Sequence, residues 1–164
     1  MSPRSLPRLV ITFAIGRAYS ATRGRSTGQE EIDVKYMLMT FGDRSALEGR
    51  SPEWITGMIE FMRSIDVELR DSGELVFQQG LADAPEAKTV SVNGGSPNVT
   101  DGPVALAKDA LAGFWIVDVA DEARAIAIAG RISEAAEAPI EVRACMDAPP
   151  PEVQQLANPA GSSA

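Results

Sequence analysis

The stretch GFWIVDV, residues Gly113–Val119, predicts a strand that is apolar on both of its faces. Successive side chains of a strand point to opposite sides of the sheet. The apolar side chains of this stretch therefore divide between the two sides, with Phe114 and Ile116 on one and Trp115, Val117 and Val119 on the other. A strand of this kind belongs in the middle of a sheet that is covered on both sides.

The stretch VKYMLMTF, residues Val34–Phe41, shows the same two-sided pattern. Tyr36 and Leu38 point one way, and Met37 and Met39 point the other. Helices packed on one side of the sheet cover only one of these apolar faces, and a second copy of the sheet is the economical cover for the other. We therefore expect a homodimer that packs sheet on sheet and forms a two-chain barrel.

Two stretches predict long helices. The first has Ser51 as N-cap, Pro52 at its first position and Gly73 as a left-handed cap at its end. Its apolar residues recur at helical spacing and predict one buried stripe: Ile55, Met58, Ile59, Met62, Ile65 and Leu69. Its polar residues are expected to face away from that stripe: Glu60, Arg63, Asp66 and Arg70. The second helix follows Asp121 as its cap and should bury Ala125, Ile128, Ala129 and Ile132.

The remaining elements complete an α+β order. ELVFQQGL (Glu74–Leu81) and PIEVRACM (Pro139–Met146) predict strands, and KTVSV and NVT predict a hairpin across NGGSP. A short helix is expected over Val104–Ala110. The order is β-α-β, a hairpin with a short helix, then β-α-β. It predicts a ferredoxin-like antiparallel sheet with both long helices on one face.

Both ends of the chain differ in composition from the predicted domain, residues 32–147. Residues 1–28 hold five arginines and no acidic residue, around the apolar run Leu9–Ile15. This pattern fits a weak signal peptide, a disordered arm, or a spurious extension upstream of a start near Val34 or Met37, so residues 1–31 are set apart. Residues 148–164 are rich in Pro and Ser and predict a disordered tail.

Composition argues against several classes of function. The net charge of −8 disfavours nucleic-acid binding, and no apolar run is long enough to span a membrane. With one cysteine and no histidine, the chain lacks a disulfide framework, the usual zinc ligands and the usual base of a serine or cysteine nucleophile. We therefore expect no metal and no cofactor, and any acid–base chemistry would use Asp, Glu, Lys, Tyr or water.

Four stretches together resemble the DGPF branch of the YCII-related proteins: VKYMLMTFGD, ELVFQQGL, VTDGPVALAKDALAGFWIVDV and APIEVRACM. The resemblance covers about residues 34–146 and keeps the order of the family's elements. It implies a ferredoxin-like fold that dimerises through its sheets as a dimeric α/β barrel. It also implies a small bacterial protein of the cytoplasm, of unassigned biochemical role and with an association to extracytoplasmic-function sigma factors.

The chain departs from the motif of that branch. Val104 stands at the position of the motif's phenylalanine, Leu106 at that of an acidic residue, and Ser91 at that of a basic residue in the hairpin, whereas Lys108 and Asp109 fit. The His-Asp pair of some YCII relatives cannot carry over to a chain without histidine. These departures weigh against this chain keeping the chemistry of the fuller motif.

Asp101, with Gly102 and Pro103, has two interpretations. An Asp at this position can bond its own backbone in a turn or cap the following short helix. Alternatively, Asp101 and Lys108 meet at the mouth of a cleft between the sheet and the short helix, where Lys108 binds an anionic ligand and Asp101 orients it or accepts a proton. Trp115 and Tyr36 predict core or interface packing, with a ligand-stacking wall as the alternative.

The favoured hypothesis is a YCII-related homodimer of the DGPF type that binds a small ligand or a protein partner and has no catalytic activity. The first alternative is an enzyme on the same scaffold, acting on a small anionic or aromatic metabolite with Asp101 and Lys108 as its polar groups and Trp115 as a wall. The second alternative is an accessory protein of a sigma factor. The sequence assigns no catalytic residue.

Overall fold

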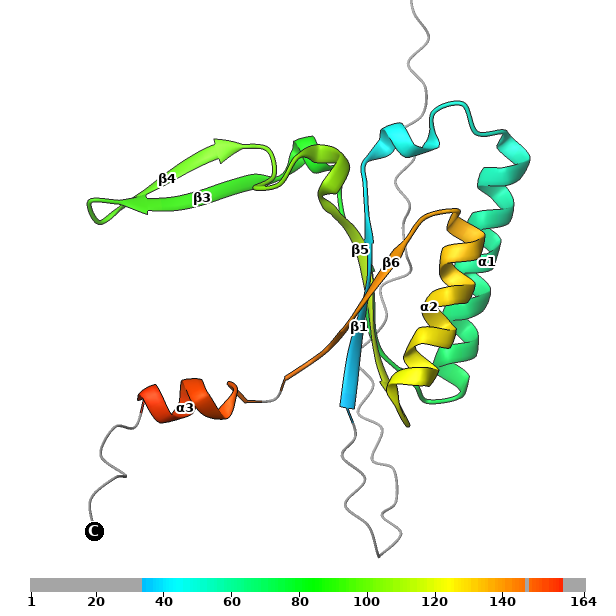
Figure 1. The fold of residues 1–164 in the computed structure, drawn as a ribbon. Coiled ribbons are helices and arrows are strands. Elements are labelled where there is room, and N and C mark those ends of the chain that lie inside the picture. Colours follow the sequence, from blue (N-terminus) through cyan, green and yellow to red (C-terminus); the bar gives the residue numbers. More distant parts are fainter. Residues whose placement is uncertain (1–33, 147, 158–164) are drawn as a thin grey trace, which may run out of the picture.

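A four-stranded antiparallel sheet forms the centre of the fold (Figure 1). The computed structural model describes residues 34–146 and 148–157, so the predicted arm over residues 1–31 lies outside the described residues. The strands are ordered β2-β5-β1-β6: β1 (Val34–Phe41), β2 (Leu75–Gly80), β5 (Leu111–Val119) and β6 (Ile140–Ala144). The predicted ferredoxin-like α+β sheet is confirmed.

Two helices, α1 (Pro52–Asp71) and α2 (Glu122–Ala136), lie side by side on one face of this sheet (Figure 1). The side chain of Ser51 accepts a hydrogen bond from the N–H of Trp54 at the start of α1. Asp121 accepts from the N–H of Arg124 at 2.8 Å at the start of α2. Both predicted N-caps are therefore present, and Gly73, with φ +76°, follows the C-cap of α1 in the left-handed region.

The core lies between this sheet face and the two helices. Its fully buried side chains come from both layers: Leu38, Ile65, Leu69, Val117, Ile128 and Ile132. In β5 the exposure alternates: Trp115, Val117 and Val119 are buried, and Phe114 and Ile116 are half-buried. The strand is thus apolar on both sides as predicted, but the helices cover only one of them, and we call the other the open face (Figure 1).

Asp66 is a correction to the predicted helix pattern. It was expected to face solvent, yet it is only 7% exposed, and its carboxylate accepts a hydrogen bond of 2.8 Å from the indole Nε1 of Trp115. Asp66 follows Met62 by four residues and precedes Leu69 by three, so it shares their face of α1. The buried indole N–H needs an acceptor, and Asp66 supplies it.

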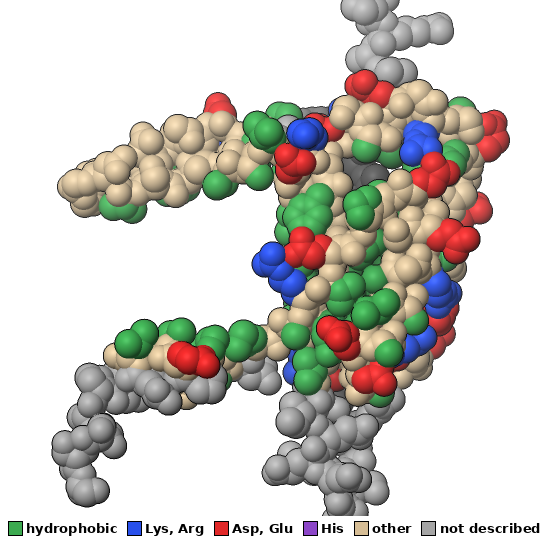
Figure 2. Space-filling model, in the orientation of Figure 1, with side chains coloured by type: hydrophobic (Ala, Val, Ile, Leu, Met, Phe, Trp, Pro, Cys, Tyr) green, Lys and Arg blue, Asp and Glu red, His purple; other side chains and the backbone are tan. Residues whose placement is uncertain are grey.

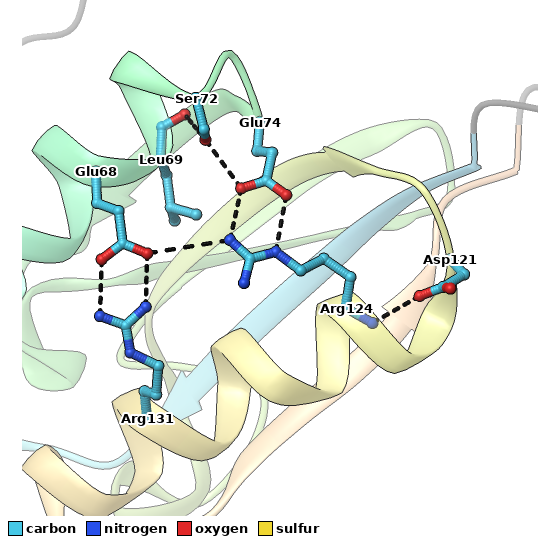
Figure 3. A network of polar contacts seen from close by, with 7 residues as sticks. All are labelled: Glu68, Leu69, Ser72, Glu74, Asp121, Arg124 and Arg131. Carbon is cyan, nitrogen blue, oxygen red and sulfur yellow. Dashed lines mark hydrogen bonds and ion pairs between the residues drawn. The ribbon is translucent and has the colours of Figure 1, made fainter.

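Charged side chains join the two helices on their outer side (Figure 3). Arg131 on α2 makes two hydrogen bonds of 2.7 Å with Glu68 on α1, and Arg124 makes two of 2.8 Å with Glu74 just before β2. The hydrogen bonds from Arg131 hold the pKa of Glu68 below its usual range. These pairs are largely or partly exposed, so they fix the relative position of the helices more than they add to stability.

The hairpin joins β3 (Lys88–Asn93) and β4 (Ser96–Asp101) as a separate two-stranded sheet. The turn residues Gly94 and Gly95 both have positive φ, +61° and +87°, as a tight two-residue turn requires. The predicted hairpin is confirmed. It projects from the open-face side of the central sheet, away from the helices (Figure 1).

The connection after Pro103 differs from the predicted short helix over Val104–Ala110. The structure has only a 3₁₀ turn over Ala107–Asp109. Val104 is 90% exposed and Leu106 69% exposed, so this segment has no buried stripe to hold a helix against the sheet.

The C-terminal segment also differs from the prediction. It contains α3 (Pro151–Ala157), whereas residues 148–164 were expected to be a disordered tail. Pro151 at the first position and Glu152 in the first turn both favour a helix start. No helix among the described residues is both long and apolar enough to cross a membrane.

Replacing Asp66 tests the buried hydrogen bond. Burial raises the pKa of Asp66, although the hydrogen bond from Trp115 and the charge of Arg70 act in the opposite direction. The contribution of this carboxyl to stability is therefore full below its unfolded-state pKa and is lost as the pH rises through its folded-state pKa. Asp66→Asn keeps the acceptor but stays neutral, so its free energy of unfolding in urea should improve relative to wild type as the pH rises above about 4, where the carboxyl ionises in the unfolded state.

The matched variant is Trp115→Phe, which keeps an aromatic side chain but removes the indole N–H that donates to Asp66. It leaves the buried Asp66 carboxylate without this hydrogen bond, at an expected cost of about 1–3 kcal/mol near neutral pH. A relative stability of Asp66→Asn that does not change with pH would contradict this account of the pair.

Candidate functional site

A groove of about 420 Å³ lies at the base of the hairpin, next to the Asp-Gly-Pro turn. Its walls come from the loop after β2 and the segment between β4 and β5. The lining is mostly apolar and includes Leu81, Ala84, Pro103, Val104, Ala110 and Leu111. Among the lining residues in the described part of the chain, only Glu86 carries a charge. The groove is therefore shaped to hold an apolar group.

Backbone hydrogen bonds fix the two walls of the groove relative to each other. Gly102 donates its N–H to the carbonyl of Ala87 at 2.8 Å, and its own carbonyl accepts from the hydroxyl of Thr89 at 2.8 Å. Gly102 has φ +99°, a conformation that favours glycine. Leu81 donates its N–H to the carbonyl of Ala112 at 2.8 Å and ties the first wall to β5. Gly102 of the motif is thus the point at which the hairpin is attached to the groove.

Asp101 and Lys108 are not paired with each other. Asp101 ends β4 and forms an exposed ion pair with Lys88 at the start of β3. Lys108 lies 3.9 Å from Asp109 and is 74% exposed. Neither side chain lines the groove, and Asp101 has no helix after it to cap. Of the predicted turn residues, Pro103 lines the groove and Gly102 supports it.

Trp115 and Tyr36 lie beneath the helices, not at a ligand surface. They are 3% and 8% exposed and belong to the core with Leu38 and Val117. Core packing, the first of the two interpretations, describes both side chains. A ligand-stacking wall does not fit them, because α1 and α2 cover the face of the sheet to which they belong.

The open face of the sheet is a second candidate surface. The strand register places Met37, Ile116 and Phe77 in one row across β1, β5 and β2. Phe114 lies beside this row, and its ring centroid is 5.8 Å from that of Phe77. The side chain of Phe77 is 41% exposed. Figure 2 shows this side of the molecule as a hollow between the hairpin and α3.

Sequence reasoning missed most residues of the groove. Leu81, Ala84 and Ala110 are small or apolar side chains in connections between strands, where they carry no chemical signature. The only signal was the Asp-Gly-Pro turn itself. Across residues 34–146 and 148–157, no three His, Cys, Asp or Glu side chains lie close enough together to hold a metal ion.

The comparison with family models gives one match to report. The YCII-related domain matches residues 34–148, which is more than half of the chain and includes the sheet, both long helices and the hairpin. No curated protein matches the chain.

The backbone at Gly102 can be tested by adding a single methyl group. Gly102→Ala should lower the free energy of unfolding by about 1–3 kcal/mol, because a side chain is strained at this positive φ even though open space surrounds it. Gly57→Ala is the matched control: Gly57 lies inside α1 with no atom in the way, so alanine should add about 1 kcal/mol. Urea unfolding at neutral pH measures both. Equal effects of the two substitutions would contradict the assigned role of Gly102.

Proposed function

The chain belongs to the YCII-related family, and on that premise we propose that it acts as a homodimer that binds a small, largely apolar ligand in the groove beside the Asp-Gly-Pro turn. The observation that carries this proposal is the groove itself. Its volume of about 420 Å³ lies in the range of small-molecule sites, and its lining is apolar with one carboxylate. A ligand with an apolar body and one hydrogen-bond donor or positive charge near Glu86 matches this lining.

Binding without catalysis fits the side chains at the groove. The polar groups of the enzyme hypothesis, Asp101 and Lys108, lie outside its lining and pair with Lys88 and Asp109. Trp115, the wall of that hypothesis, is in the core. Among the described residues that line the groove, Glu86 is the single candidate for acid–base chemistry, and no nucleophilic side chain accompanies it.

Four properties that the resemblance implies stay predictions: the branch of the family, the source, the location in the cell and the sigma-factor association. Membership of the DGPF branch and a bacterial origin rest on the motif and the resemblance, and so do a cytoplasmic location and an association with a sigma factor. The hypothesis of an enzyme acting on a small anionic or aromatic metabolite rests on the same resemblance and on Asp101 and Lys108 as its polar groups.

The homodimer is supported by the open face. The helices cover one side of β1 and β5 and leave the apolar row Met37, Ile116 and Phe77 without a cover within the described residues. A second copy offers the same row, and two such faces packed together exclude water from both. An isologous pair of this kind closes on itself, as most homodimers do.

The dimer can be tested with a charge on the open face. The full-length protein should sediment as a dimer at micromolar concentration, and Ile116→Lys should weaken the dimer at least about tenfold, because a buried lysine without a partner is costly. Ile126→Lys is the matched control, since Ile126 is 55% exposed on α2, on the opposite side of the sheet. A monomeric wild-type protein in sedimentation velocity would refute the dimer.

The groove can be tested with the neutral apolar dye Nile red. The wild-type protein should bind the dye with an increase in fluorescence, and Ala105→Trp should abolish most of this increase, because Ala105 lines the groove and the indole would fill it. Ala127→Trp, on the exposed side of α2, should bind as wild type. Unchanged dye binding by Ala105→Trp would remove the groove as the ligand site.

A further inference from the structure

The hairpin β3–β4 has one polar face. Its other face, which we call the apolar face, is apolar beyond the Lys88–Asp101 ion pair at its root. Its register places Val90 opposite Val99 and Val92 opposite Pro97, and these four side chains share one face because they alternate along each strand. The other face carries only hydroxyl and amide side chains: Thr89, Ser91, Asn93, Ser96, Asn98 and Thr100. Such a division is typical of a sheet that packs on one side and meets water on the other.

The apolar face of the hairpin has no cover among residues 34–146 and 148–157. Val90, Val92 and Val99 are 60%, 66% and 58% exposed. A two-stranded hairpin is marginally stable by itself in water. Three exposed valines on one face therefore indicate a surface that packs against something outside the described part of this chain.

The helix α3 presents a matching surface. Val153 and Leu156 are three residues apart, so they share one side of the helix, and they are 49% and 82% exposed. In Figure 2, the hydrophobic side chains of α3 gather on the side toward the hairpin, and those of the hairpin on the side toward α3. Both elements project on the open-face side of the sheet (Figure 1), and Figure 2 shows the hollow that they border together with that face.

The length of the hairpin favours a second copy of the chain as the occupant of this hollow. A strand of six residues spans about 20 Å, whereas two packed sheets lie about 10 Å apart. A partner sheet seated on the open face therefore lies within the reach of the hairpin. A second copy brings a sheet face of the same size and composition, together with the same two projecting elements.

We propose that the hairpin and α3 are arms that grip the partner subunit, so that the apolar face of the hairpin is buried against the second copy. This inference rests on the proposed dimer and adds to it. The arms extend the contact beyond the two sheets, and the valines of the hairpin become part of the interface.

A photo-crosslinker tests the contact directly. Benzoylphenylalanine placed at Val92 of the full-length protein should join two subunits on irradiation, because that side chain faces the partner. At Ser91, on the polar face of the same strand, it should give little crosslinked dimer. Mixing ¹⁴N- and ¹⁵N-labelled protein before irradiation and analysing the peptides by mass spectrometry identifies crosslinks between subunits.

Val92→Lys and Ser91→Lys give the energetic test by sedimentation. Val92→Lys should weaken the dimer about tenfold, the loss expected when the burial of a valine is given up, and Ser91→Lys should leave it nearly unchanged. Suppose that Ile116→Lys disrupts the dimer, but that the crosslink and the effect of Val92→Lys are both absent. This result would refute the contact between the arms and the partner subunit, and it would leave the sheet-on-sheet interface supported. Crosslinks from Val92 that form only within one subunit would also refute the contact between the arms and the partner subunit. A monomeric wild-type protein would overturn both proposals.

Discussion

A sheet has two faces, and two helices packed side by side cover only one of them. This constraint governs most of the molecule, because β1 and β5 carry large apolar side chains on both sides. On the helix side these side chains form the core with Ile65, Leu69, Ile128 and Ile132. On the other side Met37, Ile116 and Phe77 form the open face. The apolar surface on one side forms the core, and the apolar surface on the other side carries the proposed dimer interface.

The groove lies at the end of the sheet where β2 ends and β5 begins. The loop after β2 and the segment leading into β5 leave the sheet together, and Gly102 joins them through the carbonyl of Ala87. The Asp-Gly-Pro turn thereby acts through its backbone: glycine supplies the positive φ, and proline forms part of the wall. Asp101 is engaged with Lys88 at the base of the hairpin and takes no part in the lining.

The elements that could be predicted from sequence are those with a periodic pattern or a cap. The two-sided strands, the stripe on α2 and the caps Ser51 and Asp121 each leave a local signature that the structure bears out. Asp66 could not be placed in the same way, because its burial follows from the indole N–H of Trp115 on a strand 49 residues away. The groove was hidden for a related reason: its small apolar side chains lie in connections, and only the folded chain brings them together.

The attachment of the hairpin at Gly102 has a consequence for how ligand binding and assembly relate. The bonds that fix the walls of the groove, from Gly102 to Ala87 and from Thr89 to Gly102, are also the bonds at the root of the hairpin. If the arms grip a partner, ligand binding in the groove and the monomer–dimer equilibrium both depend on these hydrogen bonds at Gly102. By thermodynamic linkage, a ligand that stabilises this attachment of the hairpin favours the dimer, and dimer formation raises the affinity for the ligand by the same factor. The protein concentration would then be one of the variables that set the saturation of the groove.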